Sequence, residues 1–159
     1  MAKRKIKPKK HILKIDEIPQ EYDFQLIGIQ TKEQLYRLVY DFNRIFFTDF
    51  ALSEDIKVIR KNTKINFENY TTSPNMLGQK MKFLNNEILV PISHPQTLFD
   101  THEAFYLFPE LSSLNYLLML PDTQLNAAVI KQYFITPYPT VWVDVDMKKC
   151  HTAFPVFPV

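Results

Sequence analysis

The first third of the chain contains a short apolar run followed by a longer segment with helical periodicity. Residues 22–29 are apolar at five of eight positions and too few for a stable helix, so they predict a buried strand. Gly28, near the end of that run, predicts a bulge or a close backbone approach. Thr31 and Gln34 fit a capping box, which predicts that a helix starts there. Apolar residues then follow at the spacing of one helix face: Leu35, Leu38, Val39 and Phe42.

The middle of the chain, residues 50–89, consists of short apolar and β-branched runs separated by polar turn residues. The runs cover 55–60, 65–71 and 79–84, and the breaks fall at 62–63, 73–75 and 85–86. Each break contains asparagine, which tolerates the positive φ of tight turns. This spacing predicts a meander of antiparallel strands.

The last third begins and ends with predicted strands. Residues 104–108 and 115–120 are strongly apolar, and the second run has the continuous pattern of a central strand buried on both faces. Asp122 or Thr123 can cap a second helix that runs to about Ile135 and ends before Pro137. Residues 140–147 alternate, which predicts a half-exposed strand. Its inward residues are Val141, Val143, Val145 and Met147, and its outward residues are Trp142, Asp144 and Asp146.

Together these elements predict an α+β fold: a mostly antiparallel sheet of about six to seven strands with two helices packed on one face. The chain has 159 residues, 46% of them hydrophobic, which is enough for one domain with a sizeable core. We expect a flexible basic arm at 1–12, a single domain at 13–150 and an irregular tail at 151–159 packed on the domain.

The scarcity of glycine and cysteine excludes several classes of function. Gly28 and Gly78 are the only glycines, so the chain has neither of the glycine-rich motifs that cradle nucleotide phosphates. Cys150 is the only cysteine, which excludes an intrachain disulfide and every zinc site built on two thiolates. There is no run of 18 apolar residues and no export signal, so we expect a cytoplasmic protein without membrane contact.

The net charge of +2 hides a division between the start of the chain and the rest. Six of the 19 basic residues lie within residues 1–10, which hold no acidic residue: Lys3, Arg4, Lys5, Lys7, Lys9 and Lys10. The remaining thirteen basic residues face seventeen acidic ones. Such an arm can contact RNA or a ribosome through phosphates, or an acidic protein surface, although a solvated tail is the commoner meaning.

Residues 108–116 read FPELSSLNY and carry a resemblance. This segment resembles the signature of an uncharacterised family of Bacteroidetes-type bacteria that is named after its motif, IPExxxVDY. Pro109, Glu110 and Tyr116 match the motif, while Phe108, Leu114 and Asn115 replace its Ile, Val and Asp. The resemblance implies a small cytosolic protein that is typically encoded near ribonuclease III and pyruvate kinase genes, with no assigned activity.

The chemistry of this segment favours a role in fixing a turn over catalysis. Pro109 cannot donate to a sheet and ends the preceding strand, Glu110 can bond backbone amides, and the Asn115 amide cannot act as a general base. The alternative is a small enzyme or ligand-binding domain whose site gathers Glu110, Asn115, Tyr116 and one histidine.

Other candidate groups are weak. Asp144 and Asp146 share one face of the predicted strand, but no third metal ligand accompanies them. His94, the pair His102–Glu103 and the pair Cys150–His151 lack the partners that catalysis or metal binding requires. Surplus aromatics could stack bases or form an interface: Tyr36, Tyr40, Tyr133, Phe134, Tyr138 and Trp142. Among them, Trp142 is the best candidate because the alternation places it outward, where its ring is exposed unless the second helix, the tail or another subunit covers it.

These observations predict a non-enzymatic binding or interaction protein with no cofactor and no metal, whose basic arm contacts RNA, a ribosome or an acidic surface. Two alternatives stay open. One is the small enzyme or ligand-binding domain described above, and the other is a homodimer assembled through an exposed strand.

Overall fold

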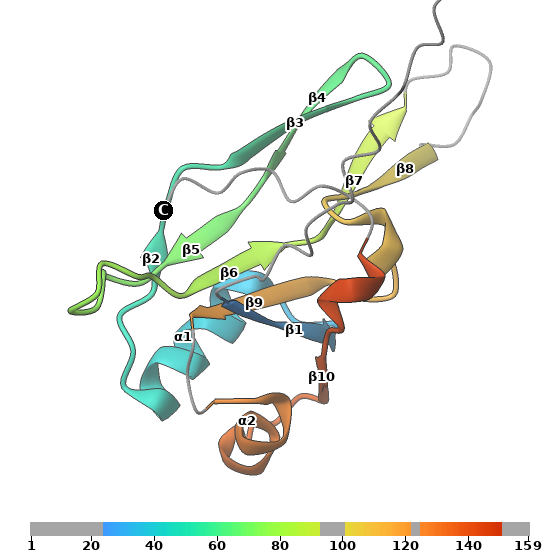
Figure 1. The fold of residues 1–159 in the computed structure, drawn as a ribbon. Coiled ribbons are helices and arrows are strands. Elements are labelled where there is room, and N and C mark those ends of the chain that lie inside the picture. The colour runs from blue at the N-terminus through green and yellow to red at the C-terminus, as the bar shows by residue number, and fades with distance from the viewer. Residues whose placement is uncertain (1–23, 93–100, 122–124, 151–159) are drawn as a thin grey trace, which may run out of the picture.

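The computed structural model describes residues 24–92, 101–121 and 125–150 (Figure 1). The basic arm, the C-terminal tail and the first part of the predicted domain lie outside these residues. In chain order the elements are β1 (Phe24–Thr31), α1 (Leu35–Phe46), β2 (Ala51–Leu52), β3 (Ile56–Arg60), β4 (Thr63–Phe67), β5 (Asn69–Thr71), β6 (Lys82–Asn85), β7 (Glu87–Ile92), β8 (Thr101–Tyr106), the 3-10 helix η1 (Pro109–Leu111), β9 (Tyr116–Pro121), α2 (Ala127–Tyr133), β10 (Thr140–Asp144) and the 3-10 helix η2 (Met147–Lys149).

Six strands form one antiparallel sheet in the order β10-β1-β9-β6-β5-β2, and β3–β4 and β7–β8 form two separate hairpins. The predicted α+β class, with a mostly antiparallel sheet and two helices, is therefore confirmed. The apolar run of 115–120 forms β9, which pairs with β1 on one side and with β6 on the other. Residues Leu117–Pro121 are all buried, as expected for a central strand.

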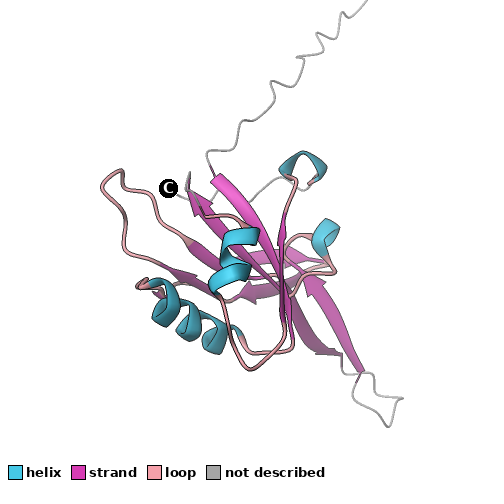
Figure 2. Cartoon of the chain, turned by 90° about the horizontal axis from the view of Figure 1, so that it is seen from below, coloured by secondary structure: helices cyan, strands magenta, loops and turns pink. Residues whose placement is uncertain are grey.

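The six-stranded sheet is covered on both faces. Successive strand residues point to opposite faces, so each central strand supplies two apolar layers. Ile27, Leu118 and Phe83 pack with residues of both helices in one cluster, while Leu26, Leu117 and Leu84 pack in the other. The second cluster also contains residues of the β3–β4 hairpin, β8 and the segment that follows it. The helices lie on one side of the sheet and the hairpins on the other in Figure 1, and Figure 2 views the helices from below.

Helix α1 begins later than the sequence predicts. The predicted capping box at Thr31 and Gln34 is wrong, because the N-cap is Gln34 and its side chain makes no capping hydrogen bond. The Thr31 hydroxyl instead accepts from the Glu33 amide at 3.2 Å and donates to the Pro139 carbonyl at 3.1 Å. A long-range contact therefore uses the oxygen that local sequence assigns to the helix.

Helix α2 is also shorter than predicted. It spans Ala127–Tyr133, and its cap is Asn126, whose side chain accepts from the Val129 amide at 3.0 Å. Asp122 and Thr123, the predicted caps, lie outside the described residues. Asn126 satisfies an amide that the first turn leaves without an intrahelical partner, so the helix starts there.

Strand β10 has the opposite orientation to the predicted one. Trp142 is only 6% exposed, whereas Val141 and Val143 are 50% and 45% exposed. The indole packs edge-on against Phe134, with ring centroids 5.0 Å apart, and also contacts Phe42 of α1. Both helices cover this face of the sheet, and the largest side chain of the strand takes the covered position. Trp142 is therefore covered by the helices, as the sequence left open for the second helix, and its ring is not exposed as an interface.

The two glycines occupy their positions for different physical reasons. Gly78 has φ +77° and closes the turn between β5 and β6, where its amide donates to the Asn75 carbonyl at 2.9 Å. Gly28 lies in β1 with continuous pairing on both sides, so the predicted close approach holds and no bulge forms. A Cβ at position 28 would lie 2.2 Å from a methyl carbon of Leu114.

We therefore expect Gly28→Ala to destabilise the fold by about 1–3 kcal/mol, because the added methyl overpacks the layer beneath the β8–β9 connection. Urea unfolding of Gly28→Ala, Leu114→Ala and the double variant measures the coupling. The double variant should lose less stability than the sum of the single losses. Additive losses would show that Leu114 does not occupy the space that Gly28 leaves.

Candidate functional site

The segment that carries the family resemblance connects β8 to β9. Phe108 is fully buried, Pro109 is the first residue of η1, and Tyr116 is the first residue of β9. Leu114 lies over Gly28 and packs against the apolar cluster on the hairpin side of the sheet. Phe108 and Leu114, the two apolar members, therefore anchor the connection to the sheet.

Asn86, which lies between β6 and β7, holds this connection through hydrogen bonds. Its side chain is fully buried, and its amide nitrogen donates to the carbonyls of Leu111 at 2.9 Å and Leu114 at 2.8 Å. Its side-chain oxygen accepts from the Phe108 amide at 2.9 Å. The Asn86 backbone amide also donates to the Asn115 carbonyl at 2.8 Å. One buried side chain thus bonds three backbone groups of the turn, of which the Leu111 carbonyl also accepts from the Leu114 amide at 2.9 Å.

Asn115 and Tyr116 direct their polar atoms into the fold. The Asn115 side-chain oxygen accepts from the Thr31 amide at 3.0 Å, and its nitrogen donates to the Glu87 carboxylate at 3.0 Å. The Tyr116 hydroxyl donates to the Glu33 carbonyl at 2.9 Å. Burial raises the pKa of Tyr116, and nearby glutamate charges raise it further, so the phenol stays protonated. These groups fix the junction of β1 and α1.

Glu110 faces another part of the chain. It lies exposed in η1. Burial of the Cys150 thiol raises its pKa, and the negative charge of Glu110 raises it further. A raised pKa leaves less thiolate at neutral pH, which lowers the nucleophilicity of Cys150. His102 is exposed on β8, while His94 and His151 lie outside the described residues. Within the residues that the structure describes, Glu110, Asn115 and Tyr116 are therefore not gathered around a histidine.

Asp144 and Asp146 serve separate local purposes. Strand β10 ends at Asp144, so the predicted shared strand face does not extend to Asp146. Asp144 accepts from the Ala127 amide and from Gln25, both at 3.1 Å, and Asp146 caps η2 by accepting from the Lys148 amide. Within the described residues, no group of three or more His, Cys, Asp and Glu side chains could hold a metal ion.

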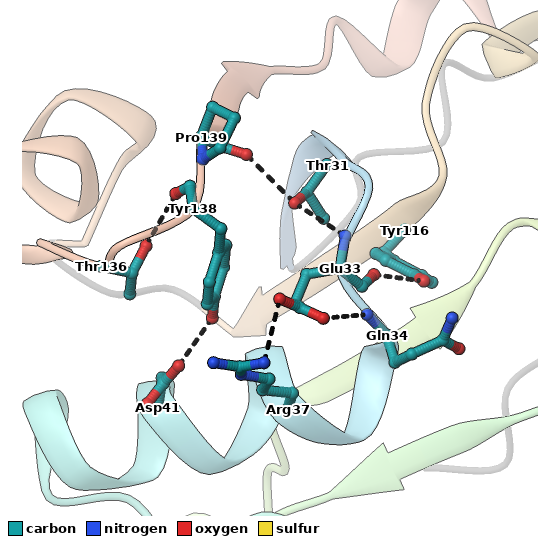
Figure 3. Close-up of polar contacts among 9 residues, drawn as sticks. All are labelled: Thr31, Glu33, Gln34, Arg37, Asp41, Tyr116, Thr136, Tyr138 and Pro139. Atoms are coloured by element: carbon teal, nitrogen blue, oxygen red, sulfur yellow. Dashed lines mark hydrogen bonds and ion pairs between the residues drawn. The ribbon is translucent and has the colours of Figure 1, made fainter.

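One side of α1 is tied to the rest of the fold by polar contacts (Figure 3). The Tyr138 hydroxyl donates to the buried Asp41 carboxylate at 2.7 Å, and burial with this bond raises the pKa of Tyr138. Arg37 pairs with Glu33 at 3.4 Å and lies over the Tyr138 ring. Arg44 pairs with Asp41 at 3.5 Å. Each arginine of α1 thus has an acidic partner, Glu33 just before the helix for Arg37 and Asp41 within it for Arg44.

A neighbouring strip of α1 carries exposed aromatic side chains. Tyr36 and Tyr40, one turn apart, are 62% and 64% exposed, and Phe47, directly after the last helical residue, is 95% exposed. We name these three residues the aromatic ridge. Asn43, between them, binds the next loop by donating to the Phe50 carbonyl at 2.9 Å. The sequence pattern singled out the two tyrosines, whereas it missed Phe47.

Phe47 combines exposure with an unusual backbone. Its φ and ψ are 53° and 42°, the left-handed conformation that helix C-caps usually assign to glycine. A bulky residue with positive φ is a genuine outlier in protein structures. The signal in the sequence was a phenylalanine at the end of a helical pattern, where glycine would be expected.

Comparison of the chain with protein-family models, with curated proteins and with solved structures finds no match. The resemblance of residues 108–116 to the IPExxxVDY family therefore stays a prediction. No helix among the described residues is long and apolar enough to cross a membrane.

The contact between Asn115 and Glu87 gives a pH-dependent prediction. Asn115→Asp restores the residue of the resembling motif, but it places a carboxylate against the Glu87 carboxylate in place of the amide donor. Two facing carboxylates raise the pKa of the pair in the folded state above the unfolded values. We therefore expect a loss of about 1–2 kcal/mol at pH 7, present above the unfolded pKa of about 4 and absent below it.

Urea unfolding of wild type and Asn115→Asp between pH 3 and pH 8 checks this expectation. The control is the double variant Asn115→Asp with Glu87→Gln, which returns a donor to the contact and should recover much of the lost stability. A loss that is equal at pH 3 and pH 7 would contradict the proposed repulsion.

Proposed function

We propose that this chain is a non-enzymatic interaction protein that docks a protein partner on the aromatic ridge of α1. The observation that carries the proposal is Phe47, which is 95% exposed and left-handed. The left-handed conformation destabilises an ordinary residue by roughly 1–2 kcal/mol. An exposed ring recovers none of this through burial, so stability alone gives no reason for phenylalanine at this position.

Contact with a partner supplies such a reason. Aromatic residues are enriched at protein interfaces, where tyrosine and phenylalanine bury large areas with few rotatable bonds. Strained backbone positions cluster at binding sites because the scaffold holds them in place. The polar contacts of Tyr138, Asp41 and Arg37 fix α1 along the neighbouring strip, so the ridge is presented on a rigid element.

The charges beside the ridge favour a protein over a nucleic acid as its partner. Arg37 and Arg44 are neutralised by Glu33 and Asp41, so this helix face carries balanced charge. A nucleic-acid surface that stacks bases on aromatic rings also needs an excess of positive charge along it. Balanced charges around an apolar centre match the polar rim of a protein interface.

The basic arm extends the proposal to RNA. Lys3, Arg4, Lys5, Lys7, Lys9 and Lys10 would contact phosphates of RNA or a ribosome in the cytoplasm, with an acidic protein surface as the alternative target. The charge division of the sequence supports this part of the proposal. A site at Glu110, Asn115 and Tyr116 is less favoured, because the Asn115 amide and the Tyr116 hydroxyl are engaged by Thr31, Glu87 and Glu33.

Phe47→Gly separates stability from binding. Glycine adopts the left-handed conformation freely, so we expect the free energy of unfolding to rise by about 1 kcal/mol, reduced by the added freedom of the unfolded chain. Urea unfolding measures the gain. A drop in stability would show that the ring supports the fold and would contradict the proposal.

The partner is tested by affinity purification of the full chain from native cells, with and without RNase. Tyr36→Ser, Tyr40→Ser and Phe47→Gly should each reduce capture of an RNase-resistant partner about tenfold or more. Tyr133→Ser is the matched control, because Tyr133 is 58% exposed on α2 and should leave capture unchanged. Equal capture by ridge and control variants would contradict the ridge as the docking site.

The same purification tests the arm and self-association. Deleting residues 2–10 should abolish salt-sensitive RNA or ribosome co-sedimentation and leave the RNase-resistant partner bound. Capture of a second copy alone, with a dimer mass by light scattering, would replace the partner protein by a homodimer.

A further inference from the structure

We propose that the outer face of the β3–β4 hairpin is a contact surface for the phosphate backbone of double-stranded RNA. This surface is separate from both the aromatic ridge and the basic arm. The hairpin, residues 56–67, holds four basic residues and no acidic one. The rest of residues 11–159 holds nine basic and seventeen acidic residues, so the positive charge of the body is concentrated on this element.

The two faces of the hairpin differ in chemistry, except that Arg60 lies half-buried on the inner face. Ile65 and Phe67 are buried, and Ile56 and Val58 pack against the same cluster. On the opposite face Lys57, Ile59, Lys64 and Asn66 are exposed. Lys57 pairs with Asn66 and Ile59 pairs with Lys64, so the two lysines are diagonal neighbours about 7–8 Å apart at the backbone.

The charge of this outer face is not neutralised. Within the part of the chain that the structure describes, Lys57 and Lys64 form no ion pair, whereas both arginines of α1 do. Lys61 pairs with Glu103 of β8 and lies over the Phe105 ring. One lysine therefore secures the tip, and two remain available to a polyanion.

The hairpin is also held in a defined position. Lys61 and Asn62 both have positive φ, 47° and 63°, which gives a tight two-residue turn that matches the strand twist. The tip is joined to β8 by the Lys61–Glu103 pair, and Figure 1 shows the two hairpins beside each other above the sheet. A preorganised surface loses little conformational entropy on binding.

The shape of the surface selects duplex RNA. Because the inner face packs on the body, only the outer face of the ribbon is available. A ribbon that reads B-DNA must enter a major groove roughly 8.5 Å deep. The minor groove of A-form RNA is wide and shallow and offers phosphates and 2′-hydroxyls to a surface that does not enter a groove. Asn66, between the lysines, can bond such hydroxyls through its amide.

The test measures binding of the full chain to a fluorescent RNA duplex of about 20 base pairs over a range of salt concentrations. Each lysine that neutralises a phosphate adds about 0.9 to the slope of log affinity against log salt. Lys57→Gln with Lys64→Gln should therefore reduce the magnitude of this slope by about two. The control, Lys32→Gln with Lys131→Gln, removes two exposed lysines elsewhere and should leave the slope unchanged.

Three outcomes would overturn the proposal. The first is an unchanged slope in the hairpin variant, with a thermal melt that shows an intact fold. The second is equal affinity for a DNA duplex of the same length, which would exclude the groove argument. The third is complete loss of binding when Lys3, Arg4, Lys5, Lys7, Lys9 and Lys10 are replaced by Gln, combined with no effect of the hairpin variant. That last result would leave the RNA role of the arm intact.

Discussion

The buried side chain of Asn86 is the interaction on which the rest of the structure depends. It bonds three backbone groups of the β8–β9 connection: the Phe108 amide before η1, the carbonyl of Leu111 at its end and the carbonyl of Leu114 after it. Removing the side chain would take the Asn86 partner from the Phe108 amide and the Leu114 carbonyl, and an unpaired polar group in the interior destabilises a fold more than one hydrogen bond stabilises it. The connection places Leu114 over Gly28 and brings Asn115 to Thr31. These contacts hold the start of β9 against β1.

These hydrogen bonds also limit the chemistry that the side chains of the connection can perform. A catalytic amide or phenol needs atoms that can approach a substrate, and here the side chains of Asn115 and Tyr116 bond protein groups. The unusual features of the molecule lie elsewhere, on α1 and on the β3–β4 hairpin. The first surface is aromatic with balanced charge, and the second is basic with unbalanced charge. This difference in charge supports the proposal that the two surfaces bind partners of different classes.

The sequence predicts the elements whose pattern arises from burial alone. The continuous apolar run of β9, the periodic face of α1 and the turn at Asn62 are present, whereas the predicted turn at 85–86 is wrong, because Asn86 links β6 to β7 without a turn. It fails where a distant contact overrides a local preference. Thr31 bonds Pro139 instead of capping α1, and Trp142 turns toward the helices because Phe134 and Phe42 lie there. The alternation of β10 shows that two faces exist, but only the packing of α2 decides which one is covered.

The candidate sites also combine features that the sequence shows with features that only the structure shows. The tyrosines of the ridge follow from helical spacing, but the strain at Phe47 depends on where α1 ends, which the misplaced cap did not show. The charge of the hairpin is visible in the sequence, whereas the burial of its inner face needs the other hairpin and the sheet.

Hydroxyl-radical footprinting of the chain, alone and in the complex captured from native cells, tests the central claim most directly. The account predicts strong protection of Tyr36, Tyr40 and Phe47 in the complex, with unchanged labelling of Tyr133. Protection centred on Glu110 and Cys150, with the ridge labelled as in the free chain, would contradict it.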